Sequence, residues 1–235
     1  MNPLKNNENR AKNAISLLWI IFIMYFVLIF SDILQTLMLN DIKSGITVSM
    51  EKVQLNNLRQ LIVSYLYLAI FIISAITFIL WFRRAYYNLH QKVTYLNYSE
   101  GWAAGAWFVP VVFLFYPLQI MKELYYETHE LLEKNQIQPK AKNNQLIIGF
   151  WWALWIIVEL LSRYEFIKMR SATTVDDVLF LTNFSIVSTI LALVNTVLII
   201  KLVKDYALLE SQLYTISKES DNTTAIEENS EAIIE

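Results

Sequence analysis

Arg84 and Asn88 are the residues of this 235-residue chain whose types and spacing most directly suggest binding chemistry. They lie four residues apart, directly after a charge-free stretch, so on a helix they share one face. An arginine and an amide placed there can hydrogen-bond carbonyls that nearby prolines leave free, or bind a lipid phosphate. An ordinary basic flank of a membrane helix is the alternative, and both interpretations stay open.

Asp32 is the one charged residue within the first long apolar stretch. A carboxylate inside a membrane is by default a functional hypothesis. However, Asp32 lies near the outer end of its stretch, where it can reach lipid headgroups or pair with Arg59 or Arg163. We favour this structural interpretation over a functional one.

Catalytic, cofactor and metal patterns are missing from the sequence. It has no cysteine and only two histidines, His90 and His129, which we expect on water-exposed helices. It contains no nucleophile–base set, metalloprotease motif, phosphate-binding loop or dinucleotide glycine pattern. We therefore expect no enzyme, no cofactor and no metal site, and the net charge of −2 argues against nucleic acid as a partner.

The composition places the chain among membrane proteins. Hydrophobic residues make up 56% of it and charged residues 17%, whereas an ordinary soluble domain has about 25% charged residues. A bilayer core needs about 20 apolar residues per helix. Four stretches meet this need, and we predict transmembrane helices at about 14–39, 61–82, 146–162 and 178–203. A polar N-terminal tail (1–13) precedes this helical membrane domain (14–218), and an acidic tail (219–235), which we expect to be disordered, follows it.

Small and polar residues recur three and four apart along the last of these stretches, at Thr182, Ser185, Thr189, Ala192 and Thr196. In lipid such a face usually marks close helix packing. A polar permeation path that also includes Asn195 is the less favoured interpretation.

Residues 101–121 carry no charge and hold half of the prolines, Pro110 and Pro117. Proline lacks an N–H and clashes with the preceding helical turn. We therefore predict a broken re-entrant or interfacial segment, with five spans as the alternative. Gly101 and Gly105 form G-x-x-x-G, which allows either a close helix contact or a flexible beginning of a short helix.

The distribution of lysine and arginine supports the four-span arrangement. If residues 101–121 do not cross, 13 of the 19 basic residues lie on one side and six on the other, whereas five spans give nine and ten. Basic residues accumulate on the cytoplasmic side. We therefore expect both termini in the cytoplasm.

Three stretches outside the predicted spans have apolar residues four and three apart, which predicts amphipathic helices. The first continues the second span over 83–98, the second covers 121–134, and the third continues the last span over 202–216. Their apolar residues are Phe82, Tyr86, Leu89, Val93, Leu96; Met121, Leu124, Tyr125, Thr128, Leu131, Leu132; and Leu202, Tyr206, Leu209, Leu213, Ile216. In the second helix Glu123 is expected on the opposite, water-facing side. We expect the three helices to form a cytoplasmic layer.

The stretches W-F-R-R-A-Y-Y-N-L (81–89), G-W-A-A-G-A-W-F-V-P (101–110) and P-L-Q-I-M-K-E-L-Y (117–125) resemble the bacterial membrane family of domain of unknown function 4328. The family pattern maps onto Trp81, Arg84, Ala85, Asn88, Leu89, Gly101, Trp102, Ala103, Gly105, Trp107, Phe108, Pro110, Pro117, Gln119, Met121, Glu123 and Leu124. The chain departs from the pattern at Glu100, Phe113 and Tyr116. The resemblance implies a multi-pass protein of the bacterial inner membrane and brings no assigned activity.

The sequence thus predicts an all-α integral membrane protein with four transmembrane helices around a proline-broken segment. The favoured function is a non-enzymatic module whose partners are the lipid bilayer, anionic lipid headgroups or another membrane protein. The alternative is a small channel or transporter that uses residues 101–121 as its gate or filter.

Overall fold

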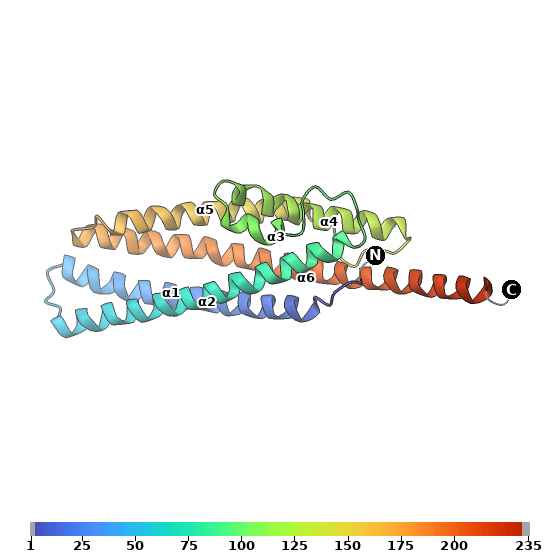
Figure 1. Ribbon diagram of the computed structural model, residues 1–235. Coiled ribbons are helices and arrows are strands. Elements are labelled where there is room, and N and C mark those ends of the chain that lie inside the picture. Colours follow the sequence, from blue (N-terminus) through green and yellow to red (C-terminus); the bar gives the residue numbers. More distant parts are fainter. Residues whose placement is uncertain (1–2, 232–235) are drawn as a thin grey trace. The chain divides into compact units, whose positions relative to one another are not determined.

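The chain is described here by a computed structural model over residues 3–231, with side chains described from Pro3 to Ile216. Its α-helices are α1 (Glu8–Lys43), α2 (Met50–His90), α3 (Trp102–Gly105), α4 (Tyr116–Lys134), α5 (Gln145–Met169) and α6 (Val175–Glu231) (Figure 1). Two short 3-10 turns, η1 (Ala106–Phe108) and η2 (Val112–Leu114), lie between α3 and α4. Residues 3–231 contain no strand.

Helices α1, α2, α5 and α6 are each long and apolar enough to cross a membrane. The pair 102–108 and 112–134 is bent by 118° at its break, as the two prolines predict. The predicted fold class, all-α with four such helices and a broken segment, is confirmed.

The helices are longer than the charge-free stretches that predict them. The polar regions 40–60 and 163–177 lie outside the predicted spans but are mostly helical, and only residues 44–49 and 170–174 connect the helices there. Charged residues such as Glu51, Lys52 and Lys168 are good helix formers, so a loss of hydropathy does not end a helix.

The chain divides into two compact units. Unit 1 comprises Met1–Ala14, Phe78–Ile148 and Lys201–Glu235, and unit 2 comprises Ile15–Thr77 and Gly149–Ile200. The four long helices contribute residues to both units.

Unit 2 is held together by small residues on α6. Ala192 is buried with Ile21 and Tyr25 of α1, and Tyr67 of α2 packs against them. The Thr182 hydroxyl accepts a hydrogen bond from Gln35 of α1 at 2.8 Å, and the Thr196 hydroxyl donates to the Ala192 carbonyl at 2.9 Å. The α6 stripe therefore packs helices, as the favoured interpretation predicts.

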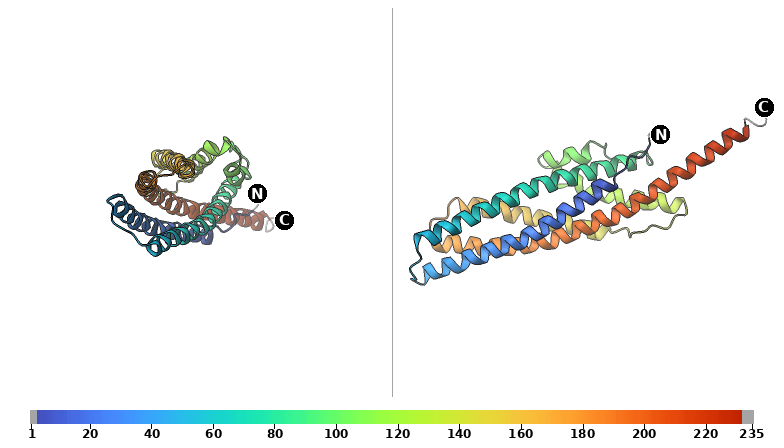
Figure 2. Two further views of the ribbon diagram at one scale, coloured as in Figure 1. Left: turned by 90° about the vertical axis from the view of Figure 1, so that its left-hand side faces the viewer. Right: turned by 90° about the horizontal axis from the view of Figure 1, so that it is seen from below.

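Unit 2 has many large apolar side chains on its outside. Its α1 and α2 segments are antiparallel, lie side by side and are joined by residues 44–49 (Figure 2). The exposed residues of these helices include Ile23, Phe26, Phe30, Leu61, Ile62, Tyr65, Ile72 and Ile73. This outward apolar character distinguishes unit 2 from a water-soluble bundle.

Unit 1 has an inward apolar core built from the predicted stripes. Its fully buried large side chains are Trp81, Phe82, Tyr86 and Leu89 of α2, Ile120, Met121, Leu124, Tyr125 and Leu132 of α4, Ile148 of α5, and Leu202 and Tyr206 of α6. The Tyr125 hydroxyl donates to the Leu202 carbonyl at 2.6 Å, and Thr128 and Tyr206 share a hydrogen bond of 3.3 Å. The two predicted helical extensions and the α4 stripe thus meet in one core.

Two predictions about unit 1 are wrong. Helix α2 ends at His90 instead of continuing to Tyr98. Residues 91–101 turn back, so that the Tyr98 backbone meets Tyr86 and His90. Glu123 is buried rather than water-facing, because its carboxylate is hydrogen-bonded inside the unit. Tertiary hydrogen bonds outweigh the local helical pattern at both places.

Helix α6 is assigned as helical to Glu231. The last four residues, and all side chains from residue 217, lie outside the described part of the chain. The predicted disorder of the acidic tail therefore stays a prediction.

Candidate functional site

Hydrogen bonds among three buried side chains hold the N-terminal segment of unit 1 against α2 and α6. We call these residues, Asn7, Asn88 and Glu210, the amide–carboxyl cluster. The Asn88 side-chain nitrogen donates to Glu210 at 2.7 Å, and that of Asn7 donates to both Glu210 oxygens at 2.9 and 3.1 Å. Asn7 also reaches the Trp81 carbonyl at 3.3 Å. A buried carboxyl needs such donors because burial removes it from water.

Asn88 also binds the backbone of Lys5. Its oxygen accepts the Lys5 N–H at 2.9 Å, its nitrogen donates to the Lys5 carbonyl at 2.8 Å, and the Tyr214 hydroxyl donates to the same carbonyl at 2.8 Å. The Lys5 ammonium lies 4.3 Å from the centre of the Tyr87 ring. Asn88 is fully buried by these contacts, so the predicted lipid or proline contacts of Asn88 are wrong.

Glu210 lies beyond the apolar span predicted for α6. Burial raises the pKa of Glu210 to about 7, although hydrogen bonds from Asn88 and Asn7 and the charge of Arg84 act in the opposite direction. The cluster therefore holds a carboxyl that changes its charge near neutral pH.

Arg84 is half-buried and, unlike Asn88, has no hydrogen-bond partner among the residues that the structure describes. Within the described residues it acts through charge, on Glu210, Tyr214 and Arg10. The Glu210 oxygens are occupied by the two asparagines. The guanidinium of Arg84 thus retains its five N–H donors.

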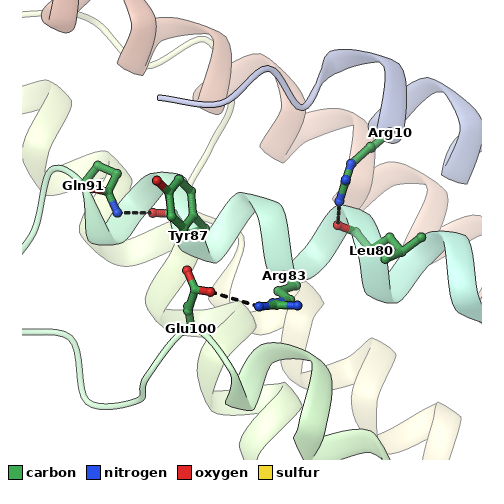
Figure 3. Close-up of polar contacts among 6 residues, drawn as sticks. All are labelled: Arg10, Leu80, Arg83, Tyr87, Gln91 and Glu100. Carbon is green, nitrogen blue, oxygen red and sulfur yellow. Dashed lines mark hydrogen bonds and ion pairs between the residues drawn. The ribbon is translucent and has the colours of Figure 1, made fainter. Parts of the chain in front are cut away.

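Two further arginines lie near Arg84: Arg83 precedes it on α2, and Arg10 of α1 is close enough to feel the charges of both. Arg10 of α1 donates to the Leu80 carbonyl at 2.9 Å, and Arg83 of α2 pairs with Glu100 at 3.1 Å (Figure 3). Burial lowers the pKa of Arg10, and the charges of Arg84 and Arg83 lower it further. We call Arg10, Arg83 and Arg84 the arginine cluster.

A second buried network joins α2, α4 and the segment between α2 and α3. The Glu123 carboxylate accepts hydrogen bonds from the Tyr86 hydroxyl at 2.5 Å and from the backbone and side chain of Asn97 at 2.9 and 2.8 Å. His90 lies 2.8 Å from the Tyr98 carbonyl. These contacts fix the turn that follows α2 and give Glu123 a structural role.

The glycines at the beginning of α3 are not at a close helix contact. A methyl group added at Gly101 or Gly105 would have no atom within 4 Å. Of the two interpretations of G-x-x-x-G, the close contact is therefore wrong, and the segment is the beginning of a short broken helix.

Trp102 and Trp107 anchor this short helix by their rings. Trp102 packs edge-on against Tyr116, with ring centres 5.3 Å apart. Trp107 packs edge-on against Phe78 and Phe82 of α2 at 5.7 and 6.3 Å, and its indole donates to the Ala103 carbonyl at 3.1 Å. These contacts orient the residues that follow.

A tight turn then directs apolar side chains outward. The Val112 N–H donates to the Pro110 carbonyl at 2.8 Å across Val111, whose φ is 68° and ψ is −46°. This γ-turn with positive φ is rare and strained. For a β-branched residue it costs about 1–3 kcal/mol, and such strain gathers at functional positions.

The side chains around this turn form what we call the apolar tip, Phe108, Val109, Pro110, Val111 and Phe115. They are exposed, with 76% of Phe108, 65% of Val111 and 53% of Phe115 accessible. No charged residue occurs between Gly101 and Met121. The chain thus holds a strained, uncharged and outward-facing apolar surface.

Pro117 is buried in the first turn of α4, where a missing N–H has no cost. The backbone N–H groups of Phe113 and Gln119 satisfy the carbonyls of Val109 and Phe115 at 3.1 and 3.0 Å. The carbonyls that the two prolines would leave free are those of Ala106 and Phe113. Within the described residues Asn88 donates to Lys5, Glu210 and Tyr214 instead, so it does not form the predicted clamp.

Asp32 lies apart from these residues along the chain, in unit 2. It is buried and accepts a hydrogen bond from Gln60 at 3.3 Å. Arg59 instead donates to the Ser31 carbonyl at 3.0 Å and to Asn56 at 2.6 Å. The predicted ion pair of Asp32 with Arg59 is wrong, and the headgroup position of Asp32 stays a prediction.

The sequence pattern does not reveal the polar roles of Asn7, Arg10, Tyr86, Asn97, Glu123 and Glu210. His129, expected on the surface, is buried. Glu123 precedes Leu124 and Glu210 follows Leu209, and both leucines belong to apolar stripes. This position beside a buried residue is the sequence feature that could have indicated burial of the two carboxyl groups. Among residues 3–231 no group of three metal-binding side chains is gathered.

The comparisons with known proteins give one family. The domain of unknown function DUF4328 matches residues 44–207, which include α2 from Met50, the apolar tip, α4, α5 and the first part of α6. No curated protein and no solved structure matches the chain.

Proposed function

The chain belongs to the family of domain of unknown function 4328, and we propose that it is a non-enzymatic module of the bacterial inner membrane that acts through lipid or protein contacts. The single observation that carries this proposal is the apolar tip. A strained turn holds uncharged side chains outward, and the favourable environment for such side chains is a bilayer interface.

The aromatic residues beside the tip support the same environment. Trp102, Trp107 and Tyr116 pack at its base, and tryptophan and tyrosine are enriched at the level of lipid headgroups. The helical pieces on either side of the tip are bent by 118° at the break, which favours a returning segment over a single straight span of about 30 Å. The tip therefore dips into the interface and returns.

Lipid quenching of a fluorophore tests this insertion, and the absence of native cysteine makes single-site labelling clean. Bimane is placed at Phe108→Cys and Val111→Cys in the full chain in nanodiscs, with Gln136→Cys after α4 as the control. Nitroxide-labelled lipid should quench the two tip positions several-fold more than position 136. Equal quenching at all three positions would disprove the proposal.

The orientation is tested by labelling from each side of the membrane. Cysteines at Ser99 and Gln136 flank the broken segment and should both react with a membrane-impermeant maleimide from the cytoplasm. Reaction from opposite sides would mean five spans and an external C-terminus.

A small channel or transporter is the second candidate, because Asp32 is buried within an apolar helix and bonded to Gln60. Proton or cation flux into proteoliposomes that is lost in Asp32→Asn would favour it. The Thr196 hydroxyl argues against a channel, because it donates its hydrogen bond to the Ala192 carbonyl and does not line a path for water.

A further inference from the structure

We propose that the arginine cluster is a binding site for the phosphate of an anionic lipid headgroup. This inference rests on the proposed function and names the partner of the module. Three guanidinium groups, two from consecutive residues of α2 and one from α1, lie near the point where α2 leaves its charge-free stretch, and the charges of Arg84 and Arg83 both act on Arg10.

The position of Arg10 gives the cluster its geometry. Its guanidinium bonds the Leu80 carbonyl at 2.9 Å (Figure 3), and in an α-helix the carbonyl of residue 80 points toward the N–H of residue 84. Arg10 is therefore held beside the beginning of the Arg84 side chain. Like charges so arranged repel each other unless an anion joins them.

The carboxylates around the cluster neutralise Arg83 but not Arg10 or Arg84. Glu100 pairs with Arg83. Glu210 has both oxygens bonded to Asn7 and Asn88, and its pKa of about 7 leaves it partly uncharged at neutral pH. Glu8 pairs with Lys12 instead. Arg10 and Arg84 thus have no carboxylate partner in the described residues.

The chemistry of the free donors fits a phosphate. Each guanidinium has five N–H donors in a planar fork, and Arg84 retains all of them. Lys5, on the ring of Tyr87 one turn further along α2, adds a fourth positive charge. The end of a charge-free span lies at headgroup level, where each arginine contributes roughly a five-fold gain in affinity for anionic lipid.

Native mass spectrometry of the purified full chain tests the site, with phosphatidylglycerol and phosphatidylcholine as the two probes. The variants are Arg10→Gln, Arg83→Gln, Arg84→Gln and the triple variant, and Lys12→Gln is the matched control, since Lys12 is exposed and one turn from Glu8. Inorganic phosphate is added in a separate arm, and thermal unfolding in neutral detergent checks that each variant is folded.

The wild-type chain should retain phosphatidylglycerol in preference to phosphatidylcholine. Arg84→Gln should reduce this preference roughly five-fold and the triple variant at least ten-fold, while Lys12→Gln should leave it unchanged. Arg84→Lys should recover part of the loss, because it restores the charge but not the fork.

Three outcomes would overturn the inference: equal retention of the two lipids by the wild-type chain, an equal loss in Lys12→Gln and Arg84→Gln, or displacement of the lipid by millimolar inorganic phosphate, which would assign the site to a free anion. If the tip positions are still quenched by lipid in that case, the proposed function stands and only the headgroup site fails.

Discussion

Unit 1 and unit 2 are built from segments of the same four long helices, yet they differ in where their large apolar side chains lie. All twelve of the largest fully buried side chains belong to unit 1. In unit 2 many large apolar side chains are instead exposed on all four long helices, and α6 also carries small and hydroxylated residues. Unit 1 therefore folds by the rules of a water-soluble core, and unit 2 by those of helices surrounded by an apolar medium.

The polar side chains follow the same division. In unit 1, Glu123 and Glu210 each accept three hydrogen bonds from amides or a phenol of distant segments. In unit 2, Arg59 and Gln60 of α2 bond to the neighbouring residues Ser31 and Asp32 of α1. Unit 2 also has long-range hydrogen bonds, such as that from Gln35 to Thr182. The two carboxyl groups that each accept three hydrogen bonds belong to unit 1, and we expect the stability of the chain to depend most on that unit.

The largest expected effect is that of a charge placed in the core of unit 1. Leu209 is fully buried and its neighbour Leu208 is 49% exposed. Leu209→Asp buries an unpaired carboxylate, which costs at least about 4 kcal/mol, so little folded protein should accumulate. Leu208→Asp is the control and should accumulate normally, as measured by detergent-extracted monodisperse protein. Equal accumulation of the two variants would refute an apolar core around α6.

The next effect comes from the amide–carboxyl cluster. Asn88→Ala removes donors from Glu210 and from the Lys5 carbonyl and leaves both buried, which should cost about 1–3 kcal/mol. Gln91→Ala, one turn further along the chain, loses only a 3.4 Å contact with the Tyr87 carbonyl (Figure 3) and should change stability by less than about 0.5 kcal/mol. Thermal unfolding in detergent measures both, and similar losses would contradict the clamp on the N-terminal segment.

The same cluster predicts a dependence of stability on pH. The pKa of Glu210 is about 7 in the folded chain and 4.5 ordinarily, so the folded state binds the proton more tightly. This contribution is complete below pH 4.5 and is lost as the pH rises through 7. The melting temperature should therefore fall by roughly 3–6 °C between pH 5 and pH 8.

Glu210→Gln tests that carboxyl alone, because every other ionisable group of the chain is retained. Its melting temperature should be nearly constant over the same interval, and it should exceed that of the wild type at pH 8. An unchanged slope in the variant would assign the pH dependence to another group.

Much of the fold follows from the sequence because its signals are local. Charge-free stretches predict α1, α2, α5 and α6, the four-and-three spacing predicts the faces of α4 and of the α6 extension, and Pro110 with Gly101 predicts a break. Each of these rests on residues within a few turns of one another.

The candidate site was harder to predict, because its residues are joined across long separations. Asn88 meets Glu210 and Lys5, which are 122 and 83 residues away, and no local pattern encodes that pairing. Helix α2 stops at His90 without glycine or proline, because Asn97 is drawn to Glu123 of α4. Arg84 could be predicted from its type and position in the sequence. The position of Arg10 beside the Leu80 carbonyl is known only from the three-dimensional structure, because the two residues are far apart in the sequence.

A last pair of variants makes the comparison within a single helix. Leu89 and Ile72 both belong to α2, but Leu89 is fully buried in unit 1 and Ile72 is about half exposed in unit 2. Leu89→Ala leaves a cavity and should cost about 2–5 kcal/mol, whereas Ile72→Ala removes atoms that already face the surroundings and should cost less than about 1 kcal/mol. Unfolding of both variants in the same detergent measures the difference. A cost for Ile72→Ala equal to that for Leu89→Ala would mean that this face of α2 is buried against a partner, and the outward apolar surface of unit 2 would then be a protein interface rather than a lipid one.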